Sequence, residues 1–117
     1  MDHLVTAEDY HAHLVKTFRI EGRVRLEFIE ALLGFCKSRL FRNMGYTSIA
    51  QYAESEFRLA ESTTFDFLRV ARRLKELPLL REAFGSGQVA WSVISNVTKV
   101  AAEGTEKDWL DGISKNG

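Results

Sequence analysis

The chain has little of what defines several common protein classes. It contains one cysteine and one proline in 117 residues. A single cysteine excludes an intramolecular disulfide. Scarce proline, together with abundant Leu, Ala, Glu, Lys and Arg, favours helices over turn-rich sheets. No apolar run approaches the roughly 18 residues that cross a bilayer, and no signal-peptide core follows Met1. These absences predict a cytoplasmic, helical protein with no membrane partner.

Net charge is also absent, since 16 basic residues balance 16 acidic ones. This balance argues against a general nucleic-acid coat protein, because phosphate binding needs a local positive surplus. The charges are nevertheless unevenly spread. Between Lys37 and Lys75 there are eight basic and four acidic residues, a surplus of +4, and the remainder of the chain carries −4. The middle of the sequence is therefore the candidate anionic-ligand region.

The apolar spacing predicts one all-α domain over residues 1–117, a compact bundle of about six or seven helices. Its N-terminal helices are expected over residues 6–43, and the first of them begins at a Thr6 cap and runs to about Phe18. A longer helical pattern follows Gly22, which either separates two helices or weakens one long helix. A helix-turn-helix-like pair is expected over residues 48–77, and short helices over residues 78–113 after Pro78.

No residue group predicts catalysis. His11 and His13 point about 200° apart on a helix and cannot hold one metal ion. Cys36 falls in an apolar stripe, which favours an inert thiol. Gly85-Ser86-Gly87 lacks the lysine and strand context of a phosphate loop. We therefore expect no enzymatic activity, no metal or cofactor, and no small-molecule substrate.

The segment from Ser48 to Leu77 has the layout of a helix-turn-helix: a short helix, a tight turn and a longer helix that opens with small polar residues. Such a second helix can enter the major groove, where hydroxyls approach base edges and arginines meet phosphates. The alternative is an ordinary antiparallel helix pair with solvated arginines. Asp66 and Glu61 count against DNA, since phosphates repel them. The predicted DNA-binding residues are Arg58, Ser62, Thr63, Arg69, Arg72, Arg73 and Lys75.

Several short blocks carry a family resemblance. They are Phe41-Arg42-Asn43-Met44-Gly45-Tyr46-Thr47-Ser48, Ser62-Thr63-Thr64-Phe65, Leu68-Arg69-Val70-Ala71-Arg72, Leu77-Pro78 and Gly87-Gln88-Val89-Ala90-Trp91-Ser92. In this order they resemble a bacterial helical domain found N-terminal to HNH endonuclease domains, with an element comparable to one in ParB-like partition proteins. The resemblance covers roughly residues 20–113. It implies a DNA-associated accessory or regulatory module that lacks the nuclease chemistry itself. Ala60 departs from the family, which usually has serine there.

Two other functional hypotheses stay open. The chain has eight Phe and two Trp, so exposed aromatics, with Trp91 and Trp109 as candidates, favour a protein-interaction or dimerisation module. A homodimer is also compatible with binding of duplex DNA, because helix-turn-helix proteins often occupy two half-sites. Alternatively, the chain is a piece of a larger enzyme.

Overall fold

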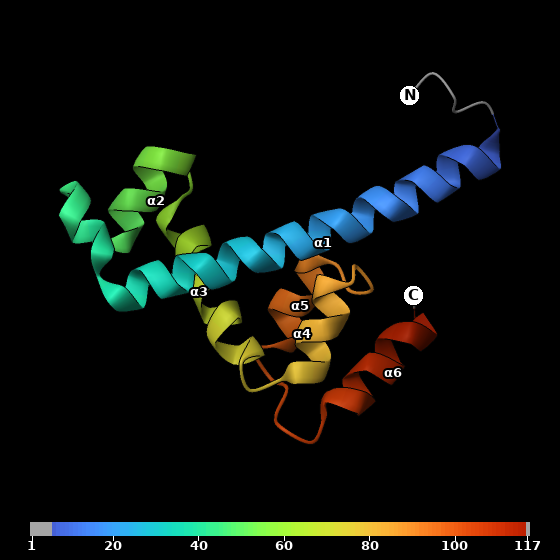
Figure 1. The fold of residues 1–117 in the computed structure, drawn as a ribbon. Coiled ribbons are helices and arrows are strands. Elements are labelled where there is room, and N and C mark those ends of the chain that lie inside the picture. Colours follow the sequence, from blue (N-terminus) through green and yellow to red (C-terminus); the bar gives the residue numbers. More distant parts are fainter. Residues whose placement is uncertain (1–5, 117) are drawn as a thin grey trace.

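The computed structural model describes residues 6–116 as an all-α fold, as the sequence predicts. Figure 1 shows one long helix, α1, crossing the whole molecule, with the shorter helices arranged along it. The described elements are α1 (Ala7–Ser38), the 3₁₀ helix η1 (Leu40–Met44), α2 (Ile49–Phe57), α3 (Glu61–Leu74), α4 (Pro78–Gly85), α5 (Trp91–Val97) and α6 (Glu106–Asn116). Residues 1–5 and 117, which the predicted domain includes, lie outside the described residues.

Local sequence signals explain most helix ends. Thr6 caps α1 through a capping box with Asp9, which satisfies two amides at the helix start. The Ser48 hydroxyl accepts from the Gln51 N–H at 3.0 Å and caps α2. Gly45 ends η1 in the left-handed conformation, with φ 91°. Pro78 occupies the first turn of α4, where its missing N–H costs nothing.

The expected end of the first helix near Phe18 is wrong, because α1 continues through Gly22 to Ser38. Gly22 is instead the point where α1 touches the turn between α4 and α5. A Cβ atom built on Gly22 would lie 2.7 Å from the Phe84 carbonyl oxygen and 3.1 Å from the Gly87 Cα. The missing side chain therefore permits a backbone-to-backbone crossing rather than a helix break.

The core lies between α1 and the α3–α4–α5 group. Most of its large, fully buried side chains come from four helices: Ile29 and Leu33 of α1, Leu68, Val70 and Leu74 of α3, Leu80 and Phe84 of α4, and Ile94 of α5. α4 has no cap of its own, and the buried Glu106 of α6 accepts from the Leu80 N–H at 2.9 Å. A distant carboxylate thus completes the start of this short helix.

The molecule is flat, with extents of 51 × 43 × 19 Å. Its radius of gyration, 16.7 Å, exceeds the roughly 13 Å expected for a domain of this length. Figure 1 shows the reason: the N-terminal half of α1 projects past the other helices. Every buried residue of α1 lies at or after Leu26. Among residues 6–116 we find no helix whose length and hydropathy suit a membrane crossing.

Candidate functional site

The helix-turn-helix-like segment forms as a helix pair. α2 ends at Phe57, Arg58 adopts a left-handed conformation with φ 59°, and α3 begins at Glu61. At the start of α3, Glu61 and Ser62 are exposed and Thr63 is half-buried. No side chain caps this start, since Ala60 occupies the cap position. The first turn of α3 is therefore accessible from outside, with free amides beside two hydroxyls.

Arg69, by contrast, faces into the molecule. Its Nη2 donates to Asp66 Oδ1 at 2.6 Å and to the Ser95 carbonyl oxygen at 3.0 Å, and its Nη1 donates to Thr98 Oγ1 at 3.2 Å. Partial burial works to raise the pKa of Asp66, but hydrogen bonds from Arg69 and Ser95 outweigh it and lower that pKa below its ordinary value. This carboxylate keeps its charge and holds the guanidinium against α5.

Arg73, one turn further along α3, has the same orientation. Its Nε donates to the Thr98 carbonyl oxygen at 3.0 Å, its Nη2 donates to the Ala101 carbonyl oxygen, and its Nη1 pairs with Glu76 at 2.6 Å. These carbonyls belong to the end of α5 and the turn after it, where intrahelical donors run out. Arg73 thus caps a seven-residue helix that is too short to be stable alone.

The predicted DNA-binding set is therefore revised. Arg69 and Arg73 are bonded within the fold and are not free to contact phosphates. The physical reason is that α5 packs beside α3, so that residues 95–101 accept the hydrogen bonds of both arginines. The sequence of α3 alone gives no sign of this contact. Five of the predicted residues remain accessible at least in part: Arg58, Ser62, Thr63, Arg72 and Lys75.

The structure adds a basic residue that the prediction left out of the site. Lys37, in the last turn of α1, lies beside Lys75 and Arg72 at the end of α3. Close contact with the Lys75 ammonium lowers the pKa of Lys37, and repulsion from Lys75 and from Arg72 acts in the same direction. All three side chains are exposed, and none forms an ion pair with an acidic residue within the described range. We call Lys37, Arg72 and Lys75 the basic cluster.

Three more exposed arginines form no ion pair with a described acidic residue: Arg39, Arg42 and Arg58. Arg39 and Arg42 follow Lys37 within five residues. Arg39 and Arg58 each end a helix with φ 59°, and they are the two described non-glycine residues at positive φ. Glycine is preferred at such helix ends because it avoids the steric cost of a Cβ atom.

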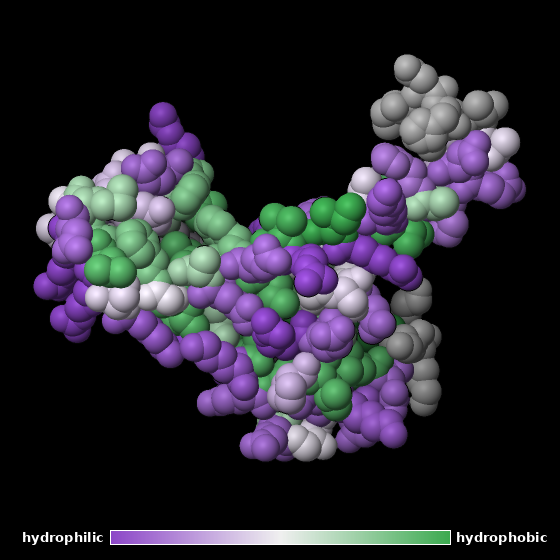
Figure 2. Space-filling model, in the orientation of Figure 1, coloured by the Kyte–Doolittle hydropathy of each residue, from purple (hydrophilic) through white to green (hydrophobic). Residues whose placement is uncertain are grey.

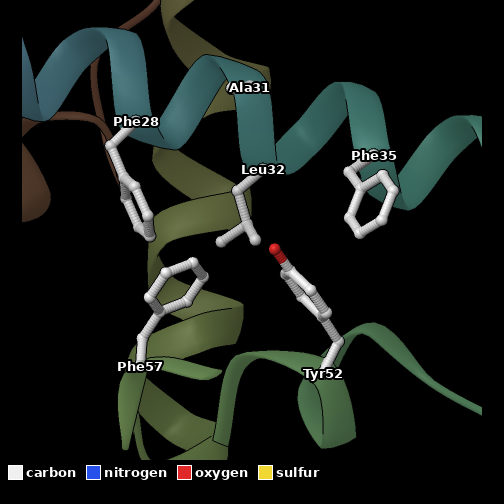
Figure 3. Close-up of a pocket in the computed structure, with 6 residues that line it drawn as sticks. All are labelled: Phe28, Ala31, Leu32, Phe35, Tyr52 and Phe57. Carbon is white, nitrogen blue, oxygen red and sulfur yellow. The ribbon is translucent and has the colours of Figure 1, made fainter. Parts of the chain in front are cut away.

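A second surface feature, an apolar groove, runs along α1. Figure 3 shows Phe28, Leu32 and Phe35 of α1 facing Tyr52 and Phe57 of α2 across a hollow. The hollow measures about 360 Å³. The rings that wall it meet edge to face, with centroids 4.8 Å apart for Phe35 and Tyr52 and 5.3 Å apart for Phe28 and Phe57. Figure 3 also shows the Tyr52 hydroxyl directed into this space.

The groove continues toward the N-terminus of α1. A neighbouring hollow of about 510 Å³ shares Phe28 and Phe57 with the first and adds Ile20, Val24 and Leu59, among other residues. In Figure 2, apolar atoms line the upper edge of α1, in the concavity between the lobe that carries α2 and the projecting half of α1. We call the two hollows together the α1 groove. No sequence signal marked it, because it needs α2 to lie against α1.

The candidate interaction residues from the sequence lie elsewhere. Trp91 is half-buried, with its ring centroid 5.0 Å from that of Phe67 and under the Arg25 guanidinium at 5.9 Å. It therefore packs as part of the core edge. Trp109 is 38% exposed. Within the part of the chain that the structure describes, no three His, Cys, Asp or Glu side chains gather as metal ligands.

No protein-family model matches this chain. No curated protein and no solved structure is significantly similar to it either. The basic cluster and the α1 groove are therefore the features from which a function can be inferred.

Proposed function

We propose that this domain binds duplex DNA through the accessible start of α3, with Arg58 beside it, and through the basic cluster at the other end of α3. The observation that carries the proposal is the basic cluster. Three cations converge from the ends of α1 and α3, and none of them forms an ion pair with a described acidic residue. Glu30, which interacts electrostatically with Lys75, is already paired with Arg81. Mutual repulsion makes this arrangement unfavourable in the free protein, and a polyanion relieves it.

The arginines at positive φ support the same conclusion. Arg39 and Arg58 occupy backbone conformations in which glycine would be more stable. Both are among the exposed basic residues that form no ion pair with a described acidic residue. Backbone strain of this kind persists where a side chain serves another purpose. The resemblance to helical domains upstream of HNH nucleases agrees with a DNA-associated module.

The geometry suits a backbone-reading mode more than extensive base readout. Arg58 and Lys75 flank the two ends of the 14-residue α3 and are therefore about 20 Å apart along it. Cations at this spacing reach several phosphates of one duplex. Base contacts are left to Ser62 and Thr63, because α5 occupies the face of α3 on which Arg69 and Arg73 lie. We therefore expect weak sequence preference and strong salt dependence.

The test is a fluorescence-anisotropy titration of the chain on a random-sequence duplex at about 50 mM salt, with a matched pair of triple variants. One variant neutralises the basic cluster: Lys37→Gln, Arg72→Gln and Lys75→Gln. The control removes the same charge from exposed positions elsewhere: Lys16→Gln, Arg19→Gln and Lys107→Gln. We expect the cluster variant to lose at least about tenfold in affinity and to lower the salt slope by about 3.

The control should bind nearly as the wild type does, apart from the smaller long-range effect of net charge. Equal losses in the two triple variants would mean that only total charge matters and would contradict the assigned surface. Absence of wild-type binding at low salt would contradict DNA binding altogether.

A further inference from the structure

The apolar stripe of α1 extends beyond the groove that α2 helps to form. Positions 10, 14, 17, 24, 28, 31 and 35 lie within about 100° of one another around a helix. Phe28, Ala31 and Phe35 of this stripe line the α1 groove. Tyr10 and Leu14 continue it on the projecting half of α1, where they are 50% and 63% exposed. One helix face thus forms a groove at one end and a ridge at the other.

The same side of α1 is also uncovered between these two ends, at Val24 of the stripe and at Ile20 on its edge. Ile20 is 52% exposed and Val24 is 58% exposed, although both border the second hollow of the groove. Large aliphatic side chains in one continuous row on a projecting helix are unfavourable in water, and such rows mark contact sites. Tyr10, Leu14, Ile20 and Val24 are each at least half exposed in the described structure.

We propose that the occupant of the α1 groove is the projecting half of α1 from a second copy of this chain, in an antiparallel, two-fold symmetric dimer. The ridge of each copy lies in the groove of the other, as a two-fold interface requires. Tyr10 and Leu14 of one copy meet Phe35 and Ala31 of its partner, and Ile20 and Val24 of both copies meet near the axis.

Length agrees with this arrangement. The ridge from Tyr10 to Val24 spans about 21 Å along the helix, and the groove from Ile20 to Phe35 spans about 22 Å. Half-exposed aromatic and aliphatic side chains each present on the order of 100 Å². Together with the surrounding atoms, two copies of the stripe would cover on the order of 1,000 Å², the size of a small specific interface. The zero net charge of the chain adds no repulsion between copies.

The first test is sedimentation velocity at several concentrations, with substitutions at exposed positions. Val24→Glu and Leu14→Glu place a charge in the proposed interface. Val100→Glu is the matched control, since Val100 is 65% exposed and lies outside α1. We expect a wild-type dimer at micromolar concentration, retention of the dimer in the control, and a rise of at least about tenfold in the Kd of both α1 variants. Circular dichroism melting checks that each variant folds.

The second test addresses orientation by disulfide trapping in a Cys36→Ser background. Leu14→Cys together with Ala31→Cys should give an oxidised dimer in high yield, because the antiparallel pair brings these positions together. The two cysteines cannot join within one chain, since about 25 Å separates them along one helix. A monomer at all concentrations, or a Val24→Glu variant that dimerises like the wild type, would overturn the proposal. Efficient trapping by Leu14→Cys alone would overturn the antiparallel arrangement.

Discussion

Arg73 of α3 donates a hydrogen bond from Nε to the main-chain carbonyl oxygen of Thr98, 3.0 Å away, where α5 ends. Its neighbour Arg72 is exposed and makes no ion pair with a described residue. The consecutive residues Arg72 and Arg73 therefore have different roles. One holds a short helix in place, and the other belongs to the basic cluster.

Arg73→Met and Arg72→Met should separate these roles. Arg73→Met leaves the Thr98 and Ala101 carbonyls without their donor, so we expect a loss of about 1–3 kcal/mol in unfolding free energy. Amide exchange should become faster in α5 before it does in α3. Arg72→Met should change stability by less than about 0.5 kcal/mol and weaken DNA binding. Urea unfolding, hydrogen exchange and the duplex titration measure the three effects. Equal destabilisation by both substitutions would contradict the assignment.

Arg58→Gly should stabilise the fold while it weakens DNA binding. Arg58 has φ 59° at the end of α2, and glycine adopts this conformation without a Cβ penalty, which is worth about 1 kcal/mol. The same substitution removes a cation from the proposed interface. The melting temperature should therefore rise, and the affinity measured in the duplex titration should fall. A drop in melting temperature would show that the Arg58 side chain is needed for the fold.

Gly22→Ala and Gly34→Ala test the crossing of α1 with the α4–α5 turn. An added Cβ on Gly22 would meet the Phe84 carbonyl oxygen at 2.7 Å, whereas nothing lies within 4 Å of the position at Gly34. Backbone atoms must shift in the first variant, at a cost of about 1–3 kcal/mol. In the second, better helix propensity should add about 0.5–1 kcal/mol. The urea midpoint of unfolding should therefore fall for Gly22→Ala and rise for Gly34→Ala.

Thr64→Val should stabilise the protein by about 1 kcal/mol. Thr64 is fully buried in α3, and its hydroxyl has no hydrogen-bond partner in the described structure. Valine has nearly the same shape and removes the unsatisfied group. Thr64→Ser, which keeps the hydroxyl and removes a methyl group, should destabilise instead. A destabilised Thr64→Val variant would mean that the hydroxyl bonds in solution.

Stability should fall in acid through Glu30 and Asp66. Two hydrogen bonds of 2.7 Å from Arg81 lower the pKa of Glu30 below its ordinary value. The pKa of Asp66 is also lower than its ordinary value. Since protonation is harder in the folded state, their stabilisation is present above the ordinary carboxyl pKa of about 4 and lost below it. Glu30→Gln should thus cost about 0.5–1 kcal/mol at pH 7, and this cost should shrink in acid as the pH falls through the lowered folded-state pKa of Glu30.

The control for the acid prediction is Glu27→Gln. Glu27 pairs with Arg23 at 3.7 Å, with side chains 70% and 79% exposed, so its removal should have little effect at pH 7 or in acid. Urea unfolding at pH 7 and at a series of acidic pH values gives both comparisons. A Glu30→Gln deficit that persists in acid would rule out the ion pair as its source.

Short-range signals predicted much of the fold. Thr6, Ser48, Gly45 and Pro78 act on amides and carbonyls within one turn, so their effects are visible in the sequence. Gly22 was ambiguous for the opposite reason. Its role depends on Gly87, which is 65 positions away along the chain and touches α1 only after folding.

The candidate site shows the same limit. Arg69, Arg72 and Arg73 have similar helix propensities and equal charges, so sequence alone gave them one role. Arg69 and Arg73 lie four residues apart and share a face, and that face meets α5, whereas Arg72 lies on another face. Lys37 was missed because its nearness to Lys75 depends on how α1 and α3 cross.

The continuity of α1 gives the projecting segment a fixed angular phase relative to the body of the molecule. One residue inserted after Lys16 would rotate everything before it by about 100°, turning Tyr10 and Leu14 away from the direction of Val24. A seven-residue insertion would restore the facing within about 20° and lengthen the arm by about 10 Å. This helix therefore acts as a torsionally stiff spacer whose length in residues sets both reach and direction.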